Sequence, residues 1–162
     1  MEIKVSTTID APIDQVWETL AGDFANGANW MSQVPVSYPI PGEAPEGMNV
    51  AGRICELTDK GSKGLIAEET IIACDVQNHR LVVDVVTKNT PPGFPVKSSQ
   101  TTFELEKLAF GQTRATVIAL PRLNILGSVL KPVLKGALAK SFDQILSDLK
   151  SHSEDSKMAV AA

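Results

Sequence analysis

The hydrophobic positions in most of the chain recur every second residue, which predicts β-strands. Residues 2–9 alternate, with Ile3, Val5, Thr7 and Ile9 on one face. Further strand patterns follow one another at short intervals, separated by turns rich in Gly, Pro, Asn and Asp, as in an antiparallel meander. They cover residues 48–57, 65–74, 80–88, 96–108 and 112–120. The Pro-rich loop 35–47 is compatible with one more short edge strand at 36–40.

A period of 3.6 residues predicts helices in three other places. After the break at Pro12, apolar residues at 13, 16, 17 and 20 predict a short amphipathic helix that ends at Gly22, and a weaker helical pattern follows at 24–31. From residue 124 or 125 to about 152 one apolar stripe predicts a helix approaching 40 Å at roughly 1.5 Å per residue. Pro132 should kink this helix or break it after a short first turn. Residues 153–162 are expected to form a disordered tail.

The order of these elements, β-α-α-β6-α, predicts an α+β fold with one domain over residues 1–152. Only the long C-terminal helix is large enough to cover the apolar face of the sheet. A strongly curved antiparallel sheet cannot close tightly on one straight helix, so the two should enclose an internal cavity. Cavities at such junctions are common sites for small molecules.

Composition narrows the class of partner. The chain has 162 residues, of which 43% are hydrophobic and only 5% aromatic, with a formal net charge of −4. A negative chain with few aromatic residues is a poor nucleic-acid binder, because it lacks both the phosphate-binding surface and the stacking platform. The sequence has no apolar run of signal-peptide type and none of membrane-spanning length, so a cytoplasmic protein without an integral membrane segment is expected.

Motifs for cofactors and covalent catalysis are missing from the sequence. Cys55 and Cys74 lie 19 positions apart without a Cys-x-x-Cys pattern, so we interpret them as buried, reduced thiols. His79 falls in a turn and His152 near the end of the long helix, and neither is a convincing general base. With no phosphate loop, metal-ligand spacing or Ser-His-Asp set, no cofactor and no metal are expected.

Three local patterns resemble the START-like, or SRPBCC, superfamily, whose members have the helix-grip fold. The stretch 9–17, Ile-Asp-Ala-Pro-Ile-Asp-Gln-Val-Trp, is similar to the family's passage from a strand into the first helix. Gly52-Arg53 is similar to its Gly-Arg strand segment. Glu69 to Asp75, followed by His79-Arg80-Leu81, resembles its Glu-x-Leu-x-x-x-Asp stretch and the next strand. The resemblance covers residues 2–150.

The superfamily includes plant abscisic acid receptors, bacterial polyketide cyclases, lipid carriers and birch-type pollen allergens. Two departures disfavour a hormone receptor. Residues 30–33 read Trp-Met-Ser-Gln, without the lysine that binds the hormone carboxylate in the receptors. Residues 61–65 read Gly-Ser-Lys-Gly-Leu, without the proline of the receptors' gate.

The resemblance also implies which side chains face the cavity. The family's matching glutamate points inward, which implies that Glu69 lies inside and Glu68 outside. A buried Arg53 would need a carboxylate partner, and Glu69 on the neighbouring strand can supply it. We expect the two head groups to be within hydrogen-bonding distance and directed at the long helix. They could orient a polar group of a ligand, or they could be a structural ion pair that braces the sheet.

Other candidate ligand-binding residues follow from strand parity and from the apolar stripe of the last helix. Lys97 and Ser99 share one strand face with Thr101 and Phe103, and parity with the receptor family implies that this face points inward. Lys97 could meet a ligand acid or form an imine, or it could be a rim lysine with its head group in solvent. Trp30 could close one end of the pocket or belong to the plain core. Leu130 and Phe142 are expected to line the cavity from the helix side.

These observations favour a protein that binds a small, largely apolar molecule such as a lipid, polyketide or isoprenoid. An enzyme of polyketide cyclase, dehydratase or lyase type would use the same cavity, but it would need an acid–base pair placed on the substrate. Arg53 is a fixed cation, and Glu69 neutralised by Arg53 would be a poor base. A protein-interaction module of chaperone-activator type is a third alternative, because the fold also hosts that function.

Overall fold

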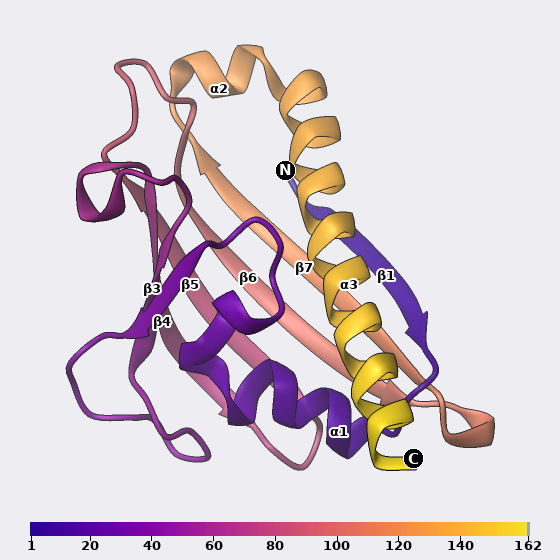
Figure 1. Ribbon diagram of the computed structural model, residues 1–162. Coiled ribbons are helices and arrows are strands. Elements are labelled where there is room, and N and C mark those ends of the chain that lie inside the picture. The colour runs from indigo at the N-terminus through magenta and orange to yellow at the C-terminus, as the bar shows by residue number, and fades with distance from the viewer. Residues whose placement is uncertain (162) are drawn as a thin grey trace.

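A computed structural model describes residues 1–161 and shows one antiparallel sheet that curves around a long helix (Figure 1). The seven strands lie in the order β1-β7-β6-β5-β4-β3-β2. Their bounds are β1 Ile3–Ile9, β2 Val36–Pro39, β3 Gly52–Glu56, β4 Ile66–Asp75, β5 Arg80–Lys88, β6 Val96–Lys107 and β7 Thr113–Leu123. The helix-grip architecture predicted from the sequence is confirmed.

Short helical segments connect several of the strands. The α-helix α1 (Ile13–Trp17) continues into a π-helical turn, η1 (Glu18–Gly22), and then into a 3-10 segment, η2 (Phe24–Asn29). Two single 3-10 turns, η3 (Gly61–Lys63) and η4 (Ala109–Gly111), lie in loops. Pro12 immediately precedes the first helical residue, where the missing N–H costs no hydrogen bond.

Two features of the strands come from backbone chemistry. Pro121 lies within β7, but β1 begins only at Ile3, opposite Ala119, so Pro121 is beyond the β1 ladder and its missing N–H is tolerated. The register shifts between Val96 and Ser98 on β6, opposite Leu123 and Arg122. Such a bulge adds one residue to a strand and reverses the side-chain alternation beyond it.

The last helix is broken where Pro132 predicts a break. Helix α2 (Ile125–Val129) ends at Leu130, and helix α3 (Lys131–Ala161) starts afresh with Pro132 in its first turn. None of the helices in residues 1–161 has the length and hydrophobicity needed to cross a membrane.

The prediction of a disordered tail is wrong for residues 153–161, because they continue helix α3. Residue 162 lies outside the described part of the chain. Ser153 is fully buried. The Gln15 side-chain amide donates a hydrogen bond to the Ser153 carbonyl (2.7 Å), and the Asp10 backbone N–H donates to Glu154 (2.9 Å). These contacts to the start of α1 hold the last turns in place, and no hydrophobic periodicity would have indicated them.

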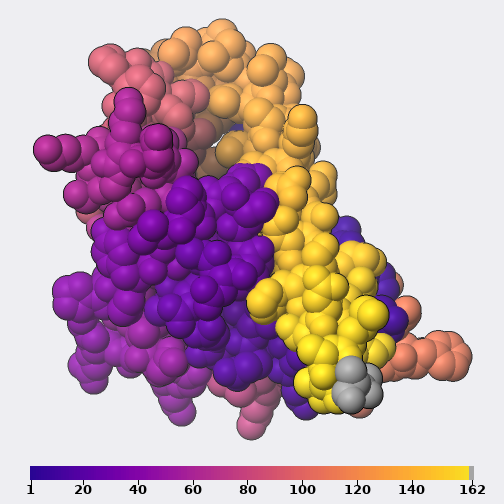
Figure 2. Space-filling view, in the orientation of Figure 1, coloured from indigo at the N-terminus to yellow at the C-terminus, as the bar shows by residue number. Residues whose placement is uncertain are grey.

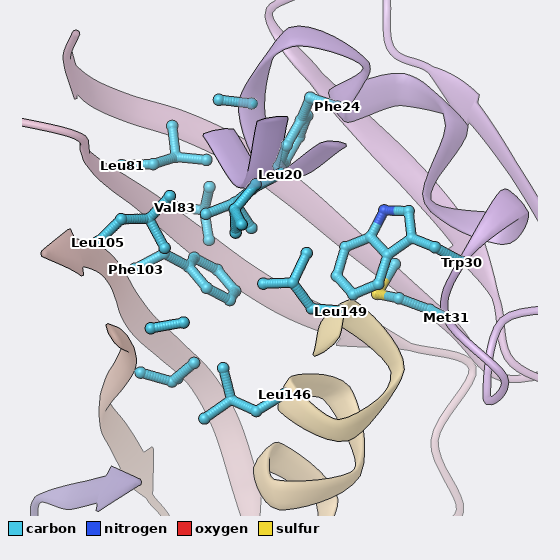
Figure 3. Close-up of a cluster of buried hydrophobic side chains, with 14 of the residues drawn as sticks. Leu20, Phe24, Trp30, Met31, Leu81, Val83, Phe103, Leu105, Leu146 and Leu149 are labelled. Atoms are coloured by element: carbon cyan, nitrogen blue, oxygen red, sulfur yellow. The ribbon is translucent and has the colours of Figure 1, made fainter. Parts of the chain in front are cut away.

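The hydrophobic core lies under the C-terminal half of α3 (Figure 3). There Leu146 and Leu149 extend toward the sheet residues Phe103 and Leu105 and toward Trp30. Each fully buried side chain of this size contributes roughly 1.5–3 kcal/mol. The N-terminal half of α3 is different: residues 131–137 are almost all exposed. The helix is therefore anchored at one end only.

Removal of residues 153–162 should lower the free energy of unfolding by roughly 1–3 kcal/mol, because it leaves Gln15 and the Asp10 N–H without partners at a buried contact. Removal of residues 159–162 alone is the matched control and should cost less than about 0.5 kcal/mol. Urea denaturation followed by circular dichroism measures both values. Equal values for the two truncations would mean that the last turns of α3 are not anchored.

Candidate functional site

Two adjoining cavities lie between the sheet and the N-terminal half of α3. The larger lobe has a volume of about 320 Å³ and the smaller lobe about 140 Å³. They share lining residues from β5, the loop before β6, and α3, namely Val85, Thr87, Phe94 and Leu138. The gap expected between a curved sheet and a straight helix is therefore present, and it lies away from the packed core.

The larger lobe extends toward β3, β4 and the segment after η2. Its walls are mostly aliphatic and sulfur-containing side chains, with a few polar groups at 33, 69, 87 and 141. The residues that belong to this lobe alone are Met31, Gln33, Val34, Cys55, Leu57, Leu65, Ala67, Glu69, Ser141 and Ile145. The lobe is therefore an apolar space with polar groups at separate points of its wall.

The smaller lobe extends toward β1, β6 and β7. The residues that belong to it alone are Ile3, Val96, Ser99, Thr101, Pro121 and Phe142. Thr101 is only 2% exposed. Within the described residues, its Oγ1 and the Oγ of Ser99 are buried without a hydrogen-bond partner. Buried hydroxyls usually have partners, so these two are unusual.

Arg53 and Glu69 form a buried ion pair on adjacent strands, as predicted. They are directly opposite in the β3–β4 register. The Arg53 Nε and Nη2 atoms lie 2.9 and 2.8 Å from Glu69 Oε2. Glu68, on the other face of β4, pairs instead with Lys88 in solvent. The inward orientation of Glu69 implied by the family resemblance is confirmed.

The Arg53 guanidinium is directed at η2, and not at the long helix as expected. Its Nη1 donates a hydrogen bond to the Phe24 carbonyl (2.9 Å), and its Cζ lies 4.1 Å from the centre of the Phe24 ring. A Cβ on Gly27 would lie 2.7 Å from Nη1, so a residue without a side chain lets the guanidinium pack this closely. Arg53 therefore fastens η2 to the sheet, while its partner Glu69 lines the larger lobe.

Glycine is required beside the ion pair for a second reason. A Cβ on Gly52 would collide with the backbone carbonyl of Glu69 on β4. Gly52 thus allows β3 and β4 to approach closely where the pair forms. The Gly-Arg pattern noted in the sequence has a structural cause: the glycine gives close strand contact, and the arginine joins three segments of the chain.

Cys55 lies between the ion pair and the larger lobe. Its Sγ is 3.9 Å from Glu69 Oε1. The pKa of the Cys55 thiol is raised to about 12, mainly because the thiol is buried. The nearby Glu69 carboxylate also raises this pKa, by more than the Arg53 charge lowers it. The thiol is therefore neutral at physiological pH. Cys55 is buried, as the sequence predicted, whereas Cys74 is half-buried.

Three of the predicted ligand-binding residues line a cavity: Glu69 the larger lobe, and Ser99 and Phe142 the smaller. Lys97 does not, and its side chain is exposed. The β6 bulge explains this correction. Val96 faces the smaller lobe, and the extra residue turns Lys97 outward before the alternation resumes at Ser99.

Arg53 and three other predicted residues lie elsewhere. Trp30 is a core residue and borders a separate surface hollow with His152. Met31, the next residue, lines the larger lobe in place of Trp30. Phe103 faces inward but is buried against the core. Leu130 caps α2 and is 40% exposed. The directions of Trp30 and Leu130 depend on the packing of a helix end, which periodicity does not fix.

Sequence reasoning missed several lining residues, including Thr87, Phe94, Val96 and Pro121. Thr101 shares the parity of Ser99 on β6 and lines the smaller lobe, on the inward face where strand parity placed it. Phe94 lies in the irregular stretch 89–95, where no periodic signal exists. Its neighbour Pro95 accepts the Asn124 backbone N–H (3.1 Å), which fixes this stretch to the start of α2.

The open end of the cavities lies beside α2. Figure 2 shows a hollow between the start of the last helices and the loops of the opposite side of the molecule. Large apolar side chains at this end are exposed to solvent, namely Ile125, Leu126, Val129, Leu130 and Val133. A group of three or more metal-ligating side chains is not found among the described residues.

Arg53→Met should lower the free energy of unfolding by about 3–5 kcal/mol, because it leaves the Glu69 carboxylate buried without its partner and frees the Phe24 carbonyl. Lys88→Met is the matched control, since it breaks the exposed pair with Glu68 on the other face of the same sheet and should cost less than about 1 kcal/mol. Chemical denaturation of both variants provides the measurement. Similar losses in the two variants would show that the Arg53 pair is solvated.

The fold was compared with known structures. A START superfamily protein from Mycobacterium smegmatis superimposes with a TM-score of 0.75 at 9% identity, covering 95% of this chain and 97% of that one. The ZhuI aromatase/cyclase from Streptomyces sp. R1128 gives 0.71 at 13% identity, covering 95% and 93%. The protein Ara h 8.0201 gives 0.66 at 11% identity, covering 94% and 97%. At such identities the likeness concerns the fold alone.

A search of curated protein sequences gave no match. A family model described as polyketide cyclase / dehydrase and lipid transport matches residues 1–154, nearly the whole chain. This match confirms the resemblance seen in the local motifs around residues 9–17, 52–53 and 69–81. The chain belongs to the polyketide cyclase / dehydrase and lipid transport family of the START-like superfamily.

Proposed function

We propose that the protein binds one small, largely apolar molecule in the two joined lobes between the sheet and α3. The observation that carries this proposal is the pair of adjoining cavities, whose shared wall is apolar except for Thr87. Ligand sites are typically concave, mostly apolar and provided with a few polar groups that fix orientation. The matching family description includes lipid transport, which is consistent with this function.

Burial of apolar surface would supply most of the affinity. Each 100 Å² of ligand surface removed from water contributes about 2.5 kcal/mol, before the cost of association is subtracted. The larger lobe alone, at about 320 Å³, is within the range of roughly 300–1,000 Å³ that is usual for sites of small, largely apolar molecules. The exposed apolar residues beside the open end, such as Leu126, would contact such a molecule as it enters, so that its apolar surface would not be fully exposed to water.

A polyketide cyclase or dehydratase is the second candidate, favoured by the family description and by the fold of the ZhuI aromatase/cyclase. The chemistry of the cavity argues for binding instead. The ionisable side chains among the described lining residues are Glu69 and Cys55. Glu69 is engaged by Arg53, and the pKa of Cys55 is raised to about 12, so neither is free for proton transfer near neutral pH. A chaperone-activator role would not require these cavities.

Leu138→Trp should abolish binding of Nile red, a neutral apolar dye, because residue 138 lines both lobes and an indole there fills the shared space. Ala137→Trp is the matched control. It adds the same side chain to an exposed neighbour on the same helix and should leave dye affinity unchanged. Fluorescence titration measures both, and thermal unfolding verifies that both variants are folded.

Equal dye affinity in the two variants would contradict the proposal, since it would locate the dye outside the lobes. Mass spectrometry of small molecules that copurify with the wild-type protein identifies the natural ligand class. Conversion of a polyketide or β-keto substrate by the purified protein, lost in Leu138→Trp, would establish the enzyme in place of the carrier.

Cys55 should report occupancy of the larger lobe. Because its thiol is buried and its pKa is raised to about 12, iodoacetamide should alkylate it much more slowly than Cys74 at pH 8. A saturating apolar ligand should slow the reaction of Cys55 further and leave Cys74 unaffected. Peptide mass spectrometry over time gives both rates. Protection of Cys74 alone would place the ligand outside the larger lobe.

A further inference from the structure

Two buried hydroxyl groups on β6 have no hydrogen-bond partner among the described residues. Ser99 Oγ and Thr101 Oγ1 lie two residues apart on the same face of one strand, and both residues line the smaller lobe. Thr101 is 2% exposed, so its hydroxyl is removed from bulk water. A buried hydroxyl without a partner destabilises the folded state, because it gives up its hydrogen bonds to water without replacing them.

The surroundings of the two hydroxyls explain why the protein itself does not satisfy them. The residues facing Ser99 in the sheet are Val85 on β5 and Pro121 on β7, and the residues facing Thr101 are Val83 and Ala119. All four side chains are apolar. The hydroxyls are therefore polar groups among apolar neighbours in the sheet, and both residues line the smaller lobe.

The charge of the lobe restricts the group that these hydroxyls can receive. Its described lining residues carry no ionisable side chain, and Lys97 is turned outward by the β6 bulge. An anionic group placed here would lose its hydration without gaining a counter-ion. The carboxylate nearest to the joined space, Glu69 in the larger lobe, would repel it as well.

Resting on the proposed function, we propose that Ser99 and Thr101 bind an uncharged oxygen of the ligand, such as the carbonyl of a ketone or ester or an alcohol. The apolar remainder of the ligand then extends along Leu138 into the larger lobe. The pair selects neutral oxygenated molecules against fatty acids and other anions. Arg53 takes no part in this recognition, since Glu69 and Phe24 occupy its guanidinium.

The test uses three probes of twelve carbons: methyl decyl ketone, dodecane and dodecanoate, each measured by displacement of Nile red. Ser99→Ala with Thr101→Val removes both hydroxyls and nearly preserves shape. Ser98→Ala with Thr102→Val is the matched control, because these residues lie on the opposite face of the same strand. The ketone should lose about fivefold or more in affinity in the first double variant, as for a net hydrogen bond, and nothing in the control.

Dodecane should bind the first double variant at least as well as the wild type, because the empty hydroxyls no longer oppose it. Dodecanoate should bind the wild type more weakly than the ketone. Equal loss of ketone and dodecane, or tighter binding of dodecanoate than of the ketone, would overturn the inference while leaving apolar binding in place. Failure of all three probes to displace the dye would overturn the proposed function itself.

Infrared spectroscopy of ¹³C-carbonyl-labelled ketone separates protein hydroxyls from trapped water. In the wild type the C=O stretching frequency of the bound ketone should be lower than its value in hexane, because a hydrogen bond weakens the C=O bond. In the Ser99→Ala, Thr101→Val variant it should return toward the hexane value. A shift of the same size in both proteins would mean that water, and not the two side chains, bonds to the carbonyl, and would refute the proposal.

Discussion

A straight helix can pack on a curved sheet over only part of the helix length. This constraint determines where the protein has a packed core and where it has cavities. The C-terminal half of α3 touches the sheet through Leu146 and Leu149 and is tied to the start of α1 through Ser153 and Glu154. With that end fixed, the N-terminal half stands away from the sheet. The resulting space holds both lobes.

The Arg53–Glu69 pair connects the part of the protein that holds the cavities to the part that holds the packed core. Arg53 holds the Phe24 carbonyl and packs on its ring, so that η2 stays against β3. Met31, shortly after η2, then takes its place in the wall of the larger lobe. Because Glu69 is both the partner of Arg53 and a lining residue, a change in the cavity near Glu69 acts on the same contact that positions η2. Of the two alternatives posed by the sequence, the structural brace describes Arg53, whereas Glu69 belongs to the brace and also lines the larger lobe.

Periodicity recovered the strands, the long helix and the break at Pro132, because each of these depends on local backbone chemistry and on which face is apolar. The pairing of Arg53 with Glu69 followed from the family resemblance, because periodicity alone did not decide which face of β4 points inward. The errors arose where packing between distant segments decides. A single extra residue in β6 turned Lys97 outward, and the order of residues 153–161 depends on polar contacts to Asp10 and Gln15. Trp30 belongs to the core, which was one of its two predicted alternatives, and Met31 lines the larger lobe, because the direction of side chains after η2 depends on how that segment docks on Arg53.

The central claim is that a small apolar molecule lies inside the joined lobes and not on the exposed apolar residues beside them. Nuclear Overhauser contacts between bound methyl decyl ketone and ¹³C-labelled methyl groups test this directly. The account predicts contacts from the ligand chain to the methyls of Val85 and Leu138. Contacts confined to Ile125, Val129 and Val133, at the exposed end, would contradict it.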